Sequence, residues 1–344
     1  MHLELVVPAL FTAQAAPPAA MQAPALELLL ARGRRTNVAA ATLESWLGRA
    51  FGLPAGSVPA GALTALAHGL DPGAQHWVRA DPVHLRADRD RLLLLPSQGF
   101  TATGAEADAL AATLQPLLSG KFTLFHARPD QWCLRIEQQG VNEKGVGEAS
   151  SKSPIEMAGD DVEPNLPPKH WHPLLTEIQM ALYAHPLNTA REQRGDPALN
   201  SVWLWGGGRI PAAARGPWQS VSADDPVALG LARLAGMRHR APGAGASEWL
   251  ARAPEDGRHL LVLEGLRAAR ALGDLEATER RLRALEEDWF APLLAALKSG
   301  RIGMVTVHVP DAAASFETAR GDLHRFWRRA RPLASYAPRA ARAA

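Results

Sequence analysis

The chain has 344 residues, of which 47% are hydrophobic and 21% are charged, and its net charge is +2. A chain of this length and apolar content can bury one or two cores, which excludes intrinsic disorder as its main state. Its single cysteine, Cys133, excludes an intramolecular disulfide framework and a zinc site built from cysteines. The nearly balanced charge gives no indication of nucleic-acid binding.

The start of the chain resembles a signal peptide only in part. A short apolar run is present, but no basic residues precede it and Glu4 interrupts it. We interpret residues 2–7 as a buried strand that Pro8 ends, followed by a loop. No segment reaches the roughly 18 uninterrupted apolar residues of a membrane span. We therefore expect a cytoplasmic protein without a membrane partner.

The next part of the chain predicts helices and then a small α+β subdomain. Between residues 76 and 138 the apolar pattern is that of strand, strand, helix, strand, strand. Thr103 and Glu106 form a capping box, which predicts the start of this helix, and Gly120 predicts its end. Apolar residues at helical spacing favour three earlier helices, over residues 26–31, 42–51 and 58–70.

The second half of the chain predicts a larger α/β region. Residues 139–169 are polar, charged and rich in Gly and Pro, which predicts a long surface loop. After residue 170, strands alternate with helices, which implies a mostly parallel sheet covered on both faces. We therefore assign residues 1–75 and 170–344 to an α/β core that carries residues 76–138 as an insertion. The expected strands are 201–205, 259–263 and 302–307, and the expected helices are 172–183, 226–235, one from Asp274 to Gly300, and 312–329.

One segment carries a resemblance to a known family. Residues 184–211, AHPLNTAREQRGDPALNSVWLWGGGRIP, resemble a stretch of archaeal-type, cofactor-independent phosphoglycerate mutases. In that family, His-Pro-x-Asn-x-x-Arg leads into Ala-Asn and a Trp-x-Trp-Gly-x-Gly strand end. The likeness continues in the same order at residues 220–237 and 242–245, and residues 77–95 resemble the start of the family's inserted domain. It covers these segments well and most of the chain weakly.

The resemblance implies an alkaline-phosphatase-like fold. This is a three-layer α/β sandwich with a mostly parallel sheet and a small inserted α+β subdomain. The chain also resembles a proteobacterial family of regulatory proteins, some of them labelled phosphoglycerate mutases, through the motifs ADPVHL, DRDRL and NSxWxWGGGRxP. That second resemblance implies a regulatory role but no established chemical activity.

The mutase family uses two divalent metals and a Ser or Thr nucleophile, and this chain departs from that pattern. Pro8 stands near the position of the expected first carboxylate, and Asn37 replaces the acid beside the nucleophile. Thr36 is the hydroxyl that matches the nucleophile, and Glu264 and His308 match ligand positions. Two metals need roughly six carboxylate or imidazole ligands. Since these three catalytic candidates fall far short of that set, we expect no metal cofactor.

Around the matched segment, several residues are candidates for binding a ligand. Trp203 and Trp205 alternate on one strand, so they form either an aromatic wall of a site or part of the core. The Gly-rich strand end either cradles a phosphate or permits a close backbone approach. The polar members form either anion contacts or hydrogen-bonding ties between elements. The candidates are His185, Asn188, Arg191, Trp203, Trp205, Gly206, Gly208 and Arg209.

Three functions follow from these observations. The first is a pseudoenzyme that binds a phosphorylated small molecule or a protein partner in a regulatory role. The second is an active phosphoglycerate mutase or phosphatase in which Thr36, Glu264 and His308 converge around Mn or Mg. The third is a structural module whose basic C-terminal stretch, residues 325–342, contacts a partner. That stretch is alternatively a solvated helix end and tail.

Overall fold

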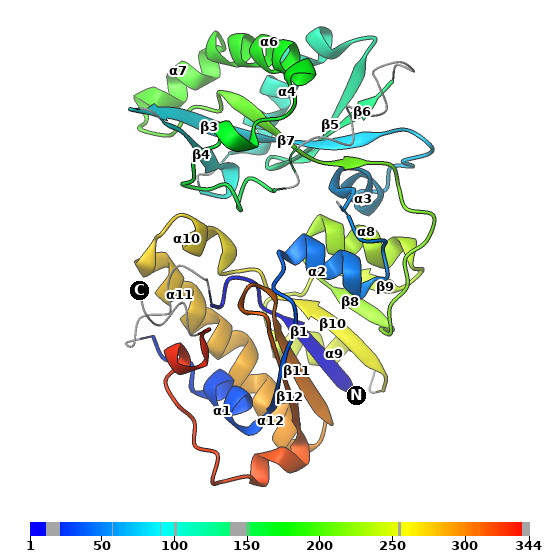
Figure 1. Cartoon of the computed structure of the whole chain (residues 1–344), viewed down its shortest axis with the longest axis vertical. Coiled ribbons are helices and arrows are strands. Elements are labelled where there is room, and N and C mark those ends of the chain that lie inside the picture. The colour runs from blue at the N-terminus through cyan, green and yellow to red at the C-terminus, as the bar shows by residue number, and fades with distance from the viewer. Residues whose placement is uncertain are drawn as a thin grey trace. The chain divides into compact units, whose positions relative to one another are not determined.

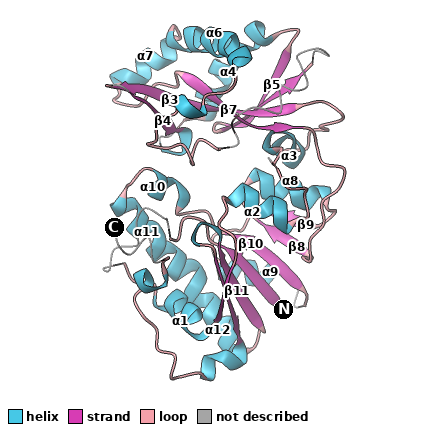
Figure 2. Ribbon diagram, viewed as in Figure 1, coloured by secondary structure: helices cyan, strands magenta, loops and turns pink. Residues whose placement is uncertain are grey.

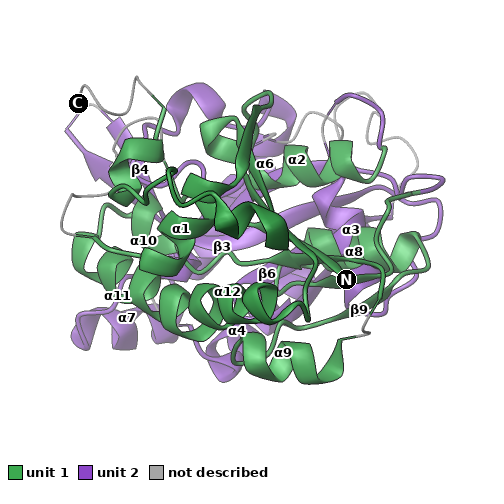
Figure 3. Cartoon of the chain, turned by 90° about the horizontal axis from the view of Figure 1, so that it is seen from below, with its two compact units in different colours: residues 1–52, 214–344 green, residues 53–213 purple. Residues whose placement is uncertain are grey.

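The computed structural model describes residues 1–11, 21–56, 58–89, 91–99, 102–137, 150, 152–253 and 256–338. The chain forms two compact units (Figures 1 and 3). Unit 1 comprises residues 1–52 and 214–344, and unit 2 comprises residues 53–213. The chain therefore leaves unit 1, builds unit 2 as an insertion, and returns.

Unit 1 is built on a mostly parallel sheet (Figure 2). Within the described residues, seven strands run in the order β2-β12-β11-β1-β10-β8-β9. The middle strands pair in parallel, whereas β12 is antiparallel to both β11 and β2. The strands are β1 (His2–Val6), β2 (Arg34–Asn37), β8 (Ser220–Ser222), β9 (Arg238–Arg240), β10 (Arg258–Val262), β11 (Met304–Val309) and β12 (Ala314–Ala319).

Helices cover both faces of this sheet, as the predicted three-layer arrangement requires. On one face, α1 (Pro24–Arg32), α9 (Ala246–Arg252), α11 (Leu275–Leu285) and α12 (Ala291–Ser299) share one core with the central strands. On the other face lie α2 (Leu43–Ala50) and α8 (Pro226–Leu234), and α10 (Arg267–Ala271) follows β10 (Figure 1).

The predicted helix from Asp274 to Gly300 is present, with a π-helical turn at Glu286–Phe290 between α11 and α12. Asp274 caps its start by accepting a hydrogen bond from Ala277 N, and Gly300 ends it with a φ of 85°. Six residues at helical spacing form a buried stripe along this helix: Thr278, Leu282, Leu285, Trp289, Leu293 and Leu297.

Unit 2 is an antiparallel sheet with helices packed on it. The predicted order of strand, strand, helix, strand, strand is confirmed, and so is the capping box at Thr103 and Glu106. Strand β3 pairs with β4, β6 and β7, and α4 and α6 share a core with this sheet. The elements are α3 (Ala60–Ala67), β3 (Trp77–Asp88), β4 (Arg91–Pro96), α4 (Gly104–Leu118), β5 (Phe122–Arg128), β6 (Gln131–Ile136), α6 (His172–Tyr183), α7 (Pro186–Gln193) and β7 (Ser201–Gly208).

The structure differs from the sequence prediction in how far the insertion extends. Residues 53–75 and 170–213 belong to unit 2, although the sequence boundaries placed them in the α/β core. The reason is that β7 pairs antiparallel with β3, and α3 packs on both strands. The strand expected at residues 201–205 is therefore not part of the parallel sheet.

Two further expectations need correction. Residues 312–329 do not form a helix, because residues 314–319 form β12 with buried and partly exposed residues alternating along it. Within the predicted surface loop 139–169, residues 152–169 pack against the rest of unit 2, since Met157 and Val162 are fully buried. Residues 139–149 and 151 lie outside the described residues. Among the helices that the structure describes, none is long and apolar enough to cross a membrane.

Candidate functional site

The carboxyl edge of the parallel sheet in unit 1 gathers acidic residues. In open α/β sheets this edge is where ligands bind, because the loops after parallel strands meet there. Asp225 follows β8, Glu264 follows β10 and Asp311 follows β11. These three carboxylates, from separate parts of the chain, are therefore brought to one edge, together with Glu44 of α2.

Arg267, at the first position of α10, is the cation of this edge. Its Nη2 donates to Glu44 Oε1 at 2.8 Å, and its Nη1 lies 3.5 Å from Glu264 Oε2. The side chains of Arg267 and Glu44 are each only 9% exposed. The guanidinium is thus held inside the edge and neutralises part of the acidic charge there. We call Glu44, Asp225, Glu264, Arg267 and Asp311 the edge cluster.

Within the edge cluster, four carboxylates face the single guanidinium of Arg267, and the excess negative charge changes their pKa values. Burial, followed by the charge of Asp225, raises the pKa of Glu264 to about 8, although Arg267 opposes the shift. Burial also raises the pKa of Asp311, although Ala9 N donates to its Oδ2 at 2.6 Å. Glu264 is therefore mostly protonated at neutral pH.

The edge cluster does not fit the two-metal centre that the resemblance implied. Within the described residues, no group of three or more His, Cys, Asp or Glu side chains is placed to hold a metal ion. Glu44 and Glu264 instead contact Arg267, and Glu44 Oε2 has no hydrogen-bond partner there. Since the donor set is mismatched, we derive no catalytic step through a metal at this edge.

His308 belongs to a second group of residues. Its Nε2 lies 3.0 Å from Glu4 Oε2, and its Nδ1 lies 3.1 Å from Ser315 Oγ. Glu4 also accepts from Arg258 Nη2 at 2.6 Å. Although burial acts to raise the pKa of Glu4, its hydrogen bonds to His308 and Arg258 outweigh this and lower the pKa to about 2. Glu4 is thus firmly ionised.

Thr36 is exposed on the edge strand β2, in register with Ser315. Because Ser315 is also in register with His308, Thr36 and His308 lie two strands apart, about 10 Å between Cα atoms. Glu264 contacts Arg267 in the edge cluster, whereas His308 contacts Glu4 and Ser315. The three catalytic candidates Thr36, Glu264 and His308 therefore contact different sets of neighbouring residues.

The polar ligand candidates of unit 2 make hydrogen bonds within that unit. His185 caps α7 by accepting from Leu187 N. Asn188 donates to Leu182 O and Leu199 O and accepts from Leu199 N. Arg191, only 1% exposed, donates to Pro197 O and to Glu106 at the start of α4. These contacts tie α7 to its neighbours.

The remaining ligand candidates lie on and after β7. Trp203 and Trp205 are buried, and their indole groups donate to Lys152 O and Asp81 Oδ2 respectively. Gly206, with a φ of 57°, leaves room for α3, since a Cβ there would lie 2.5 Å from Ala60 Cβ. A Cβ on Gly208 would lie 2.9 Å from Pro59 Cβ. The glycines thus permit a close approach of α3.

Arg209, the last of the ligand candidates, donates from Nε to His76 Nδ1 at 3.2 Å.

The sequence analysis did not identify Glu44, Asp225 and Arg267 of the edge cluster. Glu264 and Arg267 are three residues apart on one turn, a spacing that signals an ion pair. For Glu44 the sequence carries no comparable signal.

The comparisons with known proteins find structures of similar fold but identify no family for this chain. No protein-family model and no curated protein matches the chain. The structure of the PH0037 protein from Pyrococcus horikoshii resembles it with a TM-score of 0.54 and 14% identity, over 92% of this chain and 87% of that one. A cofactor-independent phosphoglycerate mutase from Thermoplasma acidophilum DSM 1728 gives a TM-score of 0.45 and 16% identity, over 93% and 90%. At 14% identity, the first likeness shows a shared fold alone.

Proposed function

We propose that this protein is a non-catalytic relative of the cofactor-independent phosphoglycerate mutases that acts by binding, in a regulatory role. The observation that carries the proposal is the buried guanidinium of Arg267 between Glu44 and Glu264, at the carboxyl edge of the parallel sheet. A fixed cation takes up carboxylate oxygens that a pair of metal ions would need.

Two-metal phosphoryl transfer needs open coordination positions that hold both the attacking and the leaving oxygen. A guanidinium donates hydrogen bonds but offers no such positions. Arg267 already engages oxygens of both Glu44 and Glu264, which favours a site without metal-dependent turnover.

A surface of unit 1 supports the binding role with a protein partner. Phe326 and Trp327 are 77% and 66% exposed, and their rings contact each other with centroids 5.3 Å apart. Exposed arginines flank them, which favours an acidic partner over a basic one. The flanking arginines with exposed side chains are Arg328, Arg329 and Arg331. We propose no nucleic-acid or membrane partner.

The partner surface is tested by replacement of its aromatic residues. An acidic protein that binds the unchanged chain should no longer bind the double variant Phe326→Ser, Trp327→Ser. The matched control is Met180→Ser, which removes an exposed apolar side chain of α6 in unit 2. Equal retention by the double variant, or retention that nuclease treatment abolishes, would contradict this surface.

Catalysis is tested by interconversion of 2- and 3-phosphoglycerate with added manganese. We expect no turnover from protein whose folding is verified by circular dichroism. Turnover that a chelator abolishes would overturn the proposal.

That outcome would support the second candidate, an active mutase or phosphatase with a rearranged site and bound Mn or Mg. The observation in its favour is the free Oε2 of Glu44, which has no hydrogen-bond partner within the described residues.

A further inference from the structure

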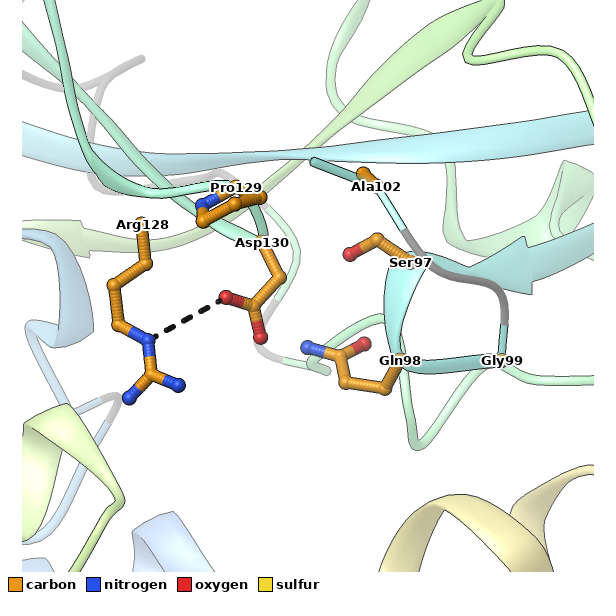
Figure 4. Close-up of a pocket in the computed structure, with 7 residues that line it drawn as sticks. All are labelled: Ser97, Gln98, Gly99, Ala102, Arg128, Pro129 and Asp130. Atoms are coloured by element: carbon orange, nitrogen blue, oxygen red, sulfur yellow. Dashed lines mark ion pairs between the residues drawn. The ribbon is translucent and has the colours of Figure 1, made fainter. Parts of the chain in front are cut away.

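Unit 2 contains a hollow of about 370 Å³ beside the turn between β5 and β6 (Figure 4). This volume is at the lower end of the range for small-molecule sites. Two turns supply its lining: the one after β4 and the one that joins β5 to β6. The lining residues are Ser97, Gln98, Gly99, Ala102, Arg128, Pro129 and Asp130. Polar side chains therefore dominate a space that fits a small molecule.

One buried polar group in this lining lacks a partner. Ser97 is only 5% exposed, yet its Oγ has no hydrogen-bond partner among the described residues. Buried hydroxyl groups are nearly always hydrogen-bonded, because an unsatisfied one loses its hydration without compensation. In Figure 4 the Ser97 hydroxyl and the carboxamide of Gln98 both point into the space in front of Asp130. A polar ligand in the hollow would satisfy Ser97.

The charged groups of the lining are only loosely paired. Arg128 Nε lies 4.0 Å from Asp130 Oδ1, and the two side chains are 54% and 29% exposed. An exposed pair at this distance contributes little to stability, so a ligand can engage both groups with little loss. The hollow thus presents a positive and a negative group side by side, so a ligand that pairs with both needs its own two charges on neighbouring atoms.

Buried residues fix the position of the turn that carries Arg128 and Asp130. Arg79 Nη2 donates to Asp130 O at 3.4 Å, and Trp132 N donates to Asp81 Oδ1 at 3.2 Å. Arg79 and Asp81 themselves form an ion pair at 2.6 Å. A turn fixed in this way loses little conformational entropy when a ligand binds.

We propose that the hollow binds a small zwitterion whose ammonium and carboxylate groups are adjacent, as in an α-amino acid. The ammonium pairs with Asp130, the carboxylate pairs with Arg128, and Ser97 with Gln98 contacts the polar remainder. The Asp130 carboxylate repels a phosphate dianion, which disfavours phosphorylated ligands at this position.

This site goes beyond the proposed function, because it consists of unit 2 residues and does not depend on the edge cluster. A result for or against phosphoglycerate turnover leaves it untouched.

The direct test is calorimetric titration of the full chain with L-serine and L-glutamine at neutral pH. Each probe is compared with glycerate, which lacks the ammonium, with ethanolamine, which lacks the carboxylate, and with 3-phosphoglycerate. We expect at least one amino acid to bind with a Kd below about 1 mM. The three comparison compounds should bind at least about tenfold more weakly, since each lacks or misplaces one charge.

Variants locate the binding in the hollow. Asp130→Asn and Arg128→Gln should each weaken amino-acid binding about tenfold or more, and Ser97→Ala should weaken it by a smaller factor. Arg135→Gln is the matched control, since Arg135 lies on β6 and pairs with Glu137 outside the hollow. Near-ultraviolet circular dichroism verifies that each variant is folded.

Three outcomes would overturn the inference. The first is that neither amino acid saturates the protein up to about 10 mM. The second is that glycerate or 3-phosphoglycerate binds as tightly as the amino acids. The third is that folded Asp130→Asn protein binds the amino acid with unchanged affinity.

Discussion

The two units each bury an arginine beside a carboxylate, and the two arrangements differ in how completely they are satisfied. In unit 2, Asp81 accepts from Arg79 Nε and Nη2, from Trp132 N and from Trp205 Nε1. Arg79 also donates to Thr64 Oγ1 and Asp130 O. In unit 1, Arg267 is surrounded by more carboxylates than it can neutralise, and Glu44 Oε2 has no partner among the described residues.

The difference separates a structural network from a site with remaining binding capacity. A buried ion pair contributes little net stability, but a fully hydrogen-bonded one specifies a single arrangement of the elements around it. The Arg79–Asp81 pair fits that description, since it joins β3, β6 and β7. The edge cluster keeps an excess of acid and a carboxyl group with a pKa of about 8, which is typical of functional sites.

The largest effect is expected from Asp81→Asn. This change removes the negative charge and leaves the Arg79 guanidinium buried without compensation, so it should destabilise the protein by about 3–5 kcal/mol. Urea unfolding measures the loss. Asp108→Asn is the control, since Asp108 is exposed and pairs with His126. A loss no larger than the control's would show that the Arg79–Asp81 pair is not the network that holds unit 2.

A smaller and pH-dependent loss is expected from Arg267→Met. Without the guanidinium, the remaining carboxylates repel each other, which should cost about 2–3 kcal/mol at pH 8. At pH 5 the loss should shrink, because Glu264 and Asp311, whose pKa values are raised, carry less negative charge there. Urea unfolding at both pH values tests this. An equal loss at both would contradict the excess of acid at this edge.

Glu264→Gln should stabilise the protein in alkaline solution. Because the pKa of Glu264 rises from 4.5 to about 8 on folding, the folded state binds the extra proton between these values. Stability from this group is full below about pH 4.5 and is lost as the pH rises through 8. The variant should thus gain about 1–3 kcal/mol over the unchanged chain near pH 9. The gain is smaller than the full pKa shift would give, because 29% of the Glu264 side chain is exposed to solvent. No gain at pH 9 would contradict the raised pKa.

The smallest effect is expected from a comparison of the two tryptophans of β7. Trp205→Phe removes a donor to the Asp81 carboxylate at 2.7 Å, whereas Trp203→Phe removes a donor to the neutral Lys152 carbonyl at 2.9 Å. Hydrogen bonds to charged groups are worth more, so Trp205→Phe should cost about 1 kcal/mol more in thermal unfolding. If Trp203→Phe costs as much, Asp81 does not need the indole donor.

Local patterns predicted much of the fold. The capping box at Thr103 and Glu106, the stripe from Thr278 to Leu297 and the strand order of residues 76–138 follow from interactions within a few residues. They are readable because helix and strand periods are short-range properties. The strand β12 was missed because its alternation is only six residues long and follows an Ala-rich stretch that also suits a helix.

The long-range features could not be read from the sequence. Glu44 and Arg267 are 223 residues apart, and Asp81 and Trp205 are 124 residues apart. No local spacing links such pairs, so their meeting depends on the strand order. The boundary of unit 2 depended likewise on the pairing of β7 with β3, which a mostly parallel reading of the second half did not include.

Titration of the unchanged chain with Mn²⁺ tests whether Arg267 takes the place of a metal ion at the carboxyl edge. We expect no saturable binding tighter than about 1 mM at pH 8. Saturable binding of one or two ions, abolished by Glu264→Gln, would show that the edge cluster accepts metal in spite of Arg267.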